Sequence, residues 1–202
     1  MKKNNNIELE LRAEVSSMQF TGLLKKLKQQ TKLISYTKRL SAMFLGKINK
    51  SNFDIRVRIN SDKKSEMVVK KGDFHTHDRV ESSQEINKSQ FIGIVKIFSL
   101  FDFKSKITER ENFVFDFGDN IYLTMVKAGN IFYAEIEKMS NEKEKEKEKE
   151  KLLKIFSNLK LNFIKDEKVF NDLCNRLSTD TDWSFDCSEE HLKKLNNMLI
   201  TY

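Results

Sequence analysis

The sequence has no proline, only two cysteines and no long uninterrupted hydrophobic run. Cys174 and Cys187 are too few for a disulfide framework in a chain of 202 residues, so we expect a reduced, intracellular protein. The most apolar stretch, FIGIVKIFSLF, is interrupted by Lys96 and is shorter than the roughly 18 residues of a transmembrane helix. No apolar segment follows the initial MKKNNN, as a secretory signal would require. We therefore expect no membrane partner.

Several motifs of common enzyme classes are also absent. The chain has no P-loop and no GxGxxG, which argues against ordinary NTPases and dinucleotide-binding enzymes. No RNP-like or helix-turn-helix pattern supports nucleic-acid binding, and we expect no DNA partner. His75 and His77 lack the further Cys or His ligands of a zinc site, so a polar loop or strand end is favoured, with substrate contact left open. Cys174 lies on an apolar helical face, which favours core packing, and Cys187 receives no reactive role.

The composition fits one domain with a basic balance of charge. The chain is 39% hydrophobic, enough for a core, and 33% charged, with a formal net charge of +7. A basic chain favours polyanionic partners such as nucleotides, polyphosphate, nucleic acid or acidic membranes.

Hydrophobic periodicity predicts a mixture of strands and helices. Period-two runs indicate strands near 7–15, 33–46, 53–60, 65–72, 77–86, 104–117, 121–129 and 131–139. The short turns at 118–120 and 129–130 imply hairpins and therefore antiparallel pairing. Helical spacing indicates helices near 17–33, 88–101, 150–160, 167–177 and 189–200, the last two capped by Asp166 and Ser188. Residues 141–151, NEKEKEKEKEK, are typical of a solvated, charged linker.

Charged side chains recur on one face of several predicted strands. The residues concerned are Glu8, Glu10, Arg12, Arg56, Arg58, Lys70, Arg79, Glu81, Arg110, Glu135 and Glu137. A half-exposed sheet shows this alternation too. However, the amphipathic helices must bury an apolar face, and if they cover the apolar side of a curled sheet the charges point inward. Arginine suits bidentate phosphate binding, and paired carboxylates suit Mg²⁺ or Mn²⁺, so an interior of this kind fits a polyanion and its metal.

In this order the segments resemble the CYTH, or triphosphate tunnel metalloenzyme, superfamily. IELELR resembles its Glu-x-Glu-x-Lys/Arg strand, DIRVRI its Arg-x-Arg strand, MVVKKG its strand ending in Lys, DRVES its Arg-x-Glu strand, TERENF its late Arg-Glu and YAEIEK its closing Glu-x-Glu. The resemblance covers residues 7–138. The chain departs from the family where Glu109 replaces a basic residue, with Lys106 nearby, and where LTMVK lacks an acid and carries Lys127.

The resemblance implies an α+β fold, a closed eight-stranded antiparallel β-barrel forming a tunnel, with surrounding helices and a helical C-terminal region. Residues 1–140 would form the tunnel core, 141–151 a charged linker, and 152–202 helices that pack on the tunnel. The implied activity is that of a divalent-metal-dependent triphosphatase using Mg²⁺ or Mn²⁺. The resemblance implies catalytic Glu8, Glu10, Glu135 and Glu137, metal binding by these four and Glu81, and phosphate binding by Arg12, Arg56, Arg58, Lys70, Arg79 and Arg110.

Several alternatives stay open at this level. The substrate is inorganic tripolyphosphate, a nucleoside or other organic triphosphate, or an RNA 5′ end, which would make the protein an RNA 5′-triphosphatase of mRNA capping. A class IV-type adenylate cyclase and a non-catalytic polyphosphate-binding module remain as alternatives. Lys38 and Arg39 point either into the tunnel or to the surface. The sequence fixes neither the metal nor the oligomeric state.

Overall fold

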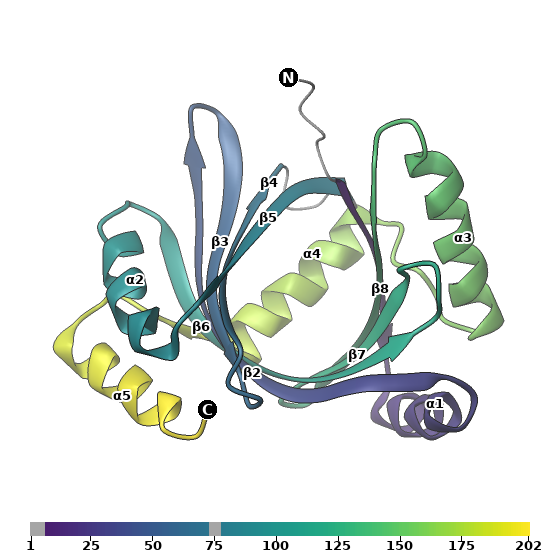
Figure 1. Ribbon diagram of the computed structural model, residues 1–202, viewed down its shortest axis with the longest axis horizontal. Coiled ribbons are helices and arrows are strands. Elements are labelled where there is room, and N and C mark those ends of the chain that lie inside the picture. The colour runs from purple at the N-terminus through teal and green to yellow at the C-terminus, as the bar shows by residue number, and fades with distance from the viewer. Residues whose placement is uncertain (1–6, 73–77) are drawn as a thin grey trace.

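The computed structural model describes residues 7–72 and 78–202, and these form a closed barrel of eight antiparallel strands (Figure 1). The strands follow the order β2-β3-β4-β5-β1-β8-β7-β6, and β2 pairs with β6 to close the ring. Their bounds are β1 Ile7–Val15, β2 Lys32–Ile48, β3 Ser51–Asn60, β4 Ser65–Lys71, β5 Asp78–Ile86, β6 Lys104–Asp116, β7 Tyr122–Ala128 and β8 Ile131–Ser140. The predicted fold class is confirmed. His75 and His77 lie outside the described residues.

Turn residues with positive φ explain why consecutive strands pair as hairpins. Asn49 and Lys50 both adopt positive φ between β2 and β3, and Asp119 and Asn120 do so between β6 and β7. Gly129, with φ of 54°, turns the chain between β7 and β8. Two successive positive φ values match the right-handed twist of the flanking strands. The turns expected at 118–120 and 129–130 are therefore present.

The pleat of each strand separates apolar from charged side chains. In β1, Ile7, Leu9 and Leu11 are buried on the outside of the barrel, in a cluster with residues of α1 (Ser17–Gln30) and α3 (Lys145–Asn158). On the other side, Val57 of β3 and Ile107 of β6 are fully buried in a cluster with α2 (Phe91–Phe98) and α5 (Glu189–Leu199). Figure 1 shows these two helix pairs on opposite flanks of the barrel. The charged face of the strands is thereby turned to the interior.

Helix α4 (Glu167–Arg176) lies across one opening of the barrel, where Figure 1 shows it behind the ring of strands. Its predicted N-cap is confirmed, because the Asp166 carboxylate accepts hydrogen bonds from two backbone amides of the first turn. A π-turn η2 (Leu177–Thr181) and a two-residue strand β9 (Trp183–Ser184) then return the chain to β6. Ser188 caps α5 in the same manner. The C-terminal third of the chain thus packs on the barrel and closes one end of it.

Three helices differ in extent from the prediction. Helix α1 ends at Gln30, three residues before the expected end at 33. A 3₁₀ turn η1 (Lys88–Gln90) precedes α2, which ends at Phe98, three residues earlier than expected. Helix α3 begins at Lys145, so most of the run expected to be a linker is helical. The reason is Glu148, whose side chain is only 10% exposed and pairs with Lys138 of β8 at 2.6 Å and Lys151 at 2.8 Å. Tertiary ion pairs therefore order a segment whose local pattern resembles a solvated tract.

No helix in residues 7–72 and 78–202 has the length and apolar character to cross a membrane.

Candidate active site

Three glutamates converge inside the barrel on the wall formed by β1 and β8. The register pairs Glu10 with Glu137 across these strands, and Glu8 lies two residues before Glu10 on the same face. One carboxylate oxygen from each of Glu8, Glu10 and Glu137 lies within 4.8 Å of the other two. Three of the predicted catalytic residues are thus brought together.

The electrostatics of this carboxylate cluster reflect crowding of negative charge. Burial, together with the neighbouring Glu10, raises the pKa of Glu8 to about 8 even though Lys70 acts in the opposite direction. Burial and Glu10 likewise raise the pKa of Glu137 to about 7. Burial also disfavours the charged form of Glu10, but Arg12 and Lys70 outweigh it and hold the pKa of that carboxyl well below its usual range. Three convergent carboxylates, two of which have raised pKa values, are a donor set that fits Mg²⁺ or Mn²⁺.

Lys70, predicted as a phosphate ligand, lies inside this carboxylate cluster. Its ammonium forms ion pairs with Glu8 and with Glu81 at 2.8 Å, and lies 3.8 Å from Glu10. Its side chain is only 5% exposed. Glu81, predicted as a metal ligand, therefore contacts the ammonium and is not one of the three converging glutamates. In this arrangement Lys70 supplies positive charge to Glu8 and Glu81, and both Lys70 and Arg12 supply it to Glu10.

The remaining predicted metal ligand, Glu135, lies one step further along β8. It pairs with Arg12 of β1, which also donates to Glu10 at 2.9 Å. These carboxylates outweigh burial and raise the pKa of Arg12, which therefore stays charged. Arg12 thus links the carboxylate cluster to the cavity described next.

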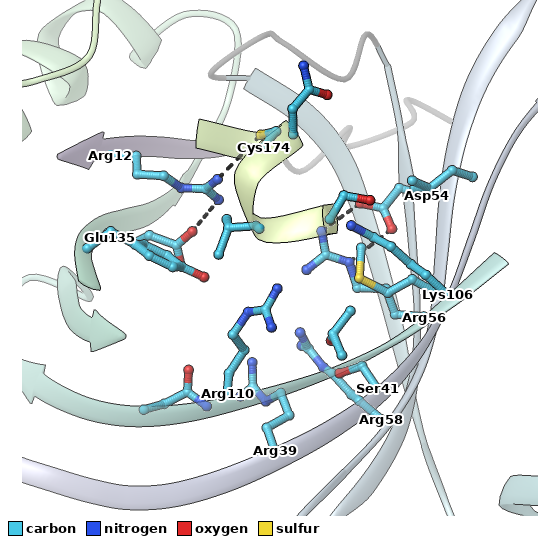
Figure 2. A pocket seen from close by; sticks show the side chains of 18 of the residues that line it. Arg12, Arg39, Ser41, Asp54, Arg56, Arg58, Lys106, Arg110, Glu135 and Cys174 are labelled. Atoms are coloured by element: carbon cyan, nitrogen blue, oxygen red, sulfur yellow. Dashed lines mark hydrogen bonds and ion pairs between the residues drawn. The ribbon is translucent and has the colours of Figure 1, made fainter. Parts of the chain in front are cut away.

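A cavity of about 300 Å³ occupies the barrel interior beside the carboxylate cluster (Figure 2). Eight basic side chains line it, from β1, β2, β3, β5 and β6: Arg12, Arg39, Arg56, Arg58, Arg79, Lys104, Lys106 and Arg110. Five of the six predicted phosphate ligands are among them, and Lys70 is not. Such a concentration of guanidinium groups matches a polyanion with several phosphate groups.

Two buried aspartates that sequence reasoning missed hold four of these cations. Asp54 of β3, 3% exposed, accepts hydrogen bonds from Arg56 at 2.9 and 2.6 Å and lies 3.3 Å from Arg79. Its position two residues before Arg56, on the same strand face, was the available signal.

Asp182, just after η2, is the second of these aspartates. Its fully buried carboxylate binds Lys106 at 2.8 Å and Arg110 at 2.7 Å. No local pattern reveals this contact, because it joins the C-terminal segment to β6.

Helix α4 contributes side chains to the cavity as well. Cys174 lines it, with its Sγ 4.0 Å from the Arg12 guanidinium, and Phe170 stacks over that guanidinium with its ring centroid 5.1 Å away. The prediction that Cys174 packs in the core is therefore wrong: α4 crosses the barrel opening, and this helical face meets the charged interior. The ambiguity over Lys38 and Arg39 is also resolved, since Arg39 lines the cavity and Lys38 is exposed outside it.

No family model matches the sequence, and no curated protein matches it.

Solved structures, in contrast, share its fold. A candidate adenylate cyclase from Vibrio parahaemolyticus superposes with a TM-score of 0.62 at 14% identity, covering 85% of this chain and 99% of the other. HpAC1 from Hippeastrum, described as having a dominant triphosphatase activity, gives 0.52 at 15% identity over 83% and 95%. The capping enzyme triphosphatase of mimivirus gives 0.50 at 10% identity over 78% and 90%.

These similarities cover nearly the whole length of each neighbour, and they accompany the closed barrel, the converging glutamates and the basic cavity described above. The chain therefore shares the barrel fold of these solved structures, which is the fold implied by its resemblance to the CYTH, or triphosphate tunnel metalloenzyme, superfamily.

Proposed function

We propose that the protein is a divalent-metal-dependent triphosphatase that binds its substrate's phosphate chain in the basic cavity. The observation that carries the proposal is that convergent carboxylates and a group of cations lie side by side inside one barrel. Three convergent glutamates lie on the β1–β8 wall, and eight basic side chains line the adjoining cavity. Structural neighbours that include triphosphatases support action on a triphosphate in general.

Each group has a distinct role in this proposal. Glu8, Glu10 and Glu137 would hold Mg²⁺ or Mn²⁺, which supplies Lewis-acid polarisation of a phosphoryl oxygen when bound. Glu81 and Glu135 are not among the three convergent glutamates, and they pair with Lys70 and Arg12, so we assign them to positioning these cations.

Arginines of the cavity act on the phosphate oxygens. Arg56, Arg58, Arg79 and Arg110 would hold these oxygens by charge-assisted hydrogen bonds, and Arg12 would contact the end of the chain nearest the carboxylates.

The reaction then requires position and neutralised charge rather than a covalent intermediate. A water molecule hydrogen-bonded to a carboxylate of the cluster attacks the terminal phosphorus in line with the bridging oxygen. A new P–O bond forms, the anhydride P–O bond breaks, orthophosphate and the shortened chain leave, and one proton passes to solvent. The eight cations stabilise the charge that gathers on the leaving oxygen.

Phosphate release tests the proposal. Purified protein is incubated with tripolyphosphate, ATP or triphosphorylated RNA, each with Mg²⁺ or Mn²⁺, and orthophosphate is measured. We expect metal-dependent release from at least one substrate. Glu8→Gln and Glu137→Gln should each reduce phosphate release by at least roughly tenfold. This is the smaller end of the loss seen when a residue that only supports a metal ligand is replaced, and a direct ligand should matter at least as much.

A matched control separates loss of a site carboxylate from loss of charge. Glu150→Gln makes the same change on the exposed outer face of α3 and should leave the rate unchanged. Binding of tripolyphosphate without release from any substrate would instead support a binding module, and cyclic AMP from ATP would support a cyclase. Release confined to the RNA substrate would identify an RNA 5′-triphosphatase.

A further inference from the structure

Three arginines from neighbouring strands form a wall of positive charge in the cavity. Arg39 of β2 lies directly opposite Arg110 of β6 in the β2–β6 register. On the other side of β2, Ser41 is opposite Arg58 of β3, which places Arg58 diagonally from Arg39. All three line the same cavity, and Figure 2 shows them side by side and directed into it. Like charges directly opposite on adjacent strands destabilise a sheet.

The three arginines differ in how their charge is balanced. Arg58 pairs with Glu66 at 2.8 Å, and Arg110 pairs with Asp182 at 2.7 Å. Arg39 donates from Nε to the amide oxygen of Asn60 at 2.9 Å, and the described residues provide it with no ion pair.

Burial and the neighbouring Arg58 lower the pKa of Arg39 to about 10, as expected for a cation crowded by like charge. The wall therefore contains one guanidinium that has no direct ion pair with a carboxylate in the described part of the chain, although Glu66 and Glu137 act on its charge from further away.

The arginine wall also has a defined position relative to the carboxylate cluster. In the closed ring, β1 and β2 are separated by three strands in either direction, so they lie on opposite sides of the barrel. The wall on β3, β2 and β6 thus faces the glutamates of β1 and β8 across the cavity. An extended polyanion can reach from one side to the other.

We propose that Arg39, together with Arg58 and Arg110, forms a subsite for a phosphoryl group at the end of the substrate away from the carboxylates. This inference rests on the proposed function, which it deepens by adding a binding residue outside the recognised motif strands. Asn60 fixes the Nε edge, so both Nη groups remain to donate to a tetrahedral oxyanion. A substrate that carries negative charge at both ends fills this subsite better than one whose far end is uncharged.

A purely structural role for Arg39 predicts a different outcome. If its hydrogen bond to Asn60 mainly holds the β3 end in place, removing it lowers the melting temperature. If the subsite exists, removing a crowded cation leaves the ligand-free protein as stable as before or more stable. It also reduces the stabilisation that an anion provides, since the stabilisation by a ligand grows with the logarithm of its affinity.

The experiment compares Arg39→Gln with Lys38→Gln. Lys38 is the adjacent residue of β2 and is exposed outside the cavity, so the control removes the same charge from the same strand. Binding of tripolyphosphate is measured by calorimetry in EDTA, alongside melting temperatures with and without it. We expect binding to Arg39→Gln to be roughly tenfold to a hundredfold weaker, as for loss of a charged hydrogen bond, with Lys38→Gln near wild type.

The outcomes separate this inference from the proposed function. Wild-type binding and phosphate release with unchanged affinity in Arg39→Gln would overturn the subsite and leave the triphosphatase proposal standing. A lower melting temperature of ligand-free Arg39→Gln with an undiminished tripolyphosphate shift would assign a structural role and also overturn it. If wild type neither binds tripolyphosphate nor releases phosphate from any substrate, both proposals fail.

Discussion

Replacing Asp54 by asparagine should destabilise the ligand-free barrel more than almost any other single change of charge. Asp54 is 3% exposed and accepts two hydrogen bonds from Arg56, while Arg79 lies 3.3 Å away. Asparagine has nearly the same shape but no charge, and its amide NH₂ would face a guanidinium that has no acceptor. Arg56 and Arg79, both partly buried, would then lose their shared counter-ion.

Two independent arguments give the loss of folding stability expected for Asp54→Asn. Burial opposes ionisation of Asp54, yet Arg56 and Arg79 outweigh it and lower the pKa of Asp54 from 3.8 to about 2. A difference of this size corresponds to about 2.5 kcal/mol of stability. Breaking a buried ion pair by removing one partner typically costs about 3–5 kcal/mol. For a domain of this size, such a loss lowers the melting temperature by roughly 5–20 °C.

The sign of the pH dependence follows from the lowered pKa. Because the folded protein holds Asp54 ionised more readily than the unfolded chain does, its contribution is complete above about pH 4 and is lost as pH falls toward 2. The difference in melting temperature between wild type and Asp54→Asn should therefore be largest near neutral pH and should shrink in acid.

Thermal unfolding followed by circular dichroism provides the assay, with Asp102→Asn, an exposed loop aspartate, as the matched control. Tripolyphosphate should restore part of the lost stability, because its oxygens give Arg56 and Arg79 a replacement counter-ion. If Asp54→Asn melted within about 1 °C of wild type at neutral pH, the account of Asp54 as the counter-ion of this arginine pair would be refuted.

Two further changes test the charge balance around the cavity. Lys70→Met should lower the stability of the protein in EDTA by roughly 3 kcal/mol, because it removes the ammonium shared by Glu8 and Glu81. Added Mg²⁺ or Mn²⁺ should then raise the melting temperature of this variant more than that of wild type. An equal rise in the two proteins would count against a metal at this cluster. Asp182→Asn should free Lys106 and Arg110 from their ion pairs. Calorimetry in EDTA should then show tighter binding of tripolyphosphate, although the melting temperature of the variant is lower. Unchanged affinity would mean that these cations do not face the ligand.

The barrel was predictable because the alternation of apolar and charged residues identifies both faces of its strands. A period of two places Glu8 and Glu10 on one side of β1 and Leu9 and Leu11 on the other, and the amphipathic helices require the apolar side. The alternation does not show how far along the barrel axis each side chain lies. Strands in a closed sheet are tilted and staggered, so Lys70 was assigned the correct face but lies among carboxylates rather than in the basic cavity.

Contacts between distant parts of the chain account for most of what was missed. Cys174 belongs to a helix whose apolar pattern predicts core packing, and only the path of α4 across the barrel opening brings it to Arg12. Asp182 reaches Lys106 because β9, a strand of only two residues, pairs with β6. Glu148 is buried by Lys138 of β8, so the charged run became a helix. In each case a tertiary partner overrides the local pattern.

The arrangement of charge gives a physical reason to expect a ligand. A barrel built for stability alone would pair its interior charges or replace them with apolar side chains, because buried ions without partners are costly. Here the residues that line the cavity include eight cations and only two carboxylates, Asp54 and Glu135, while three more carboxylates crowd together on the β1–β8 wall. Ion pairs with carboxylates balance part of the positive charge of the cavity, and Lys70 balances part of the negative charge of the cluster. Cations nevertheless remain in excess in the cavity, and carboxylates remain in excess at the cluster. A divalent cation on one side and a phosphate chain on the other relieve both excesses at once, and for this reason each should stabilise the protein more when the other is present.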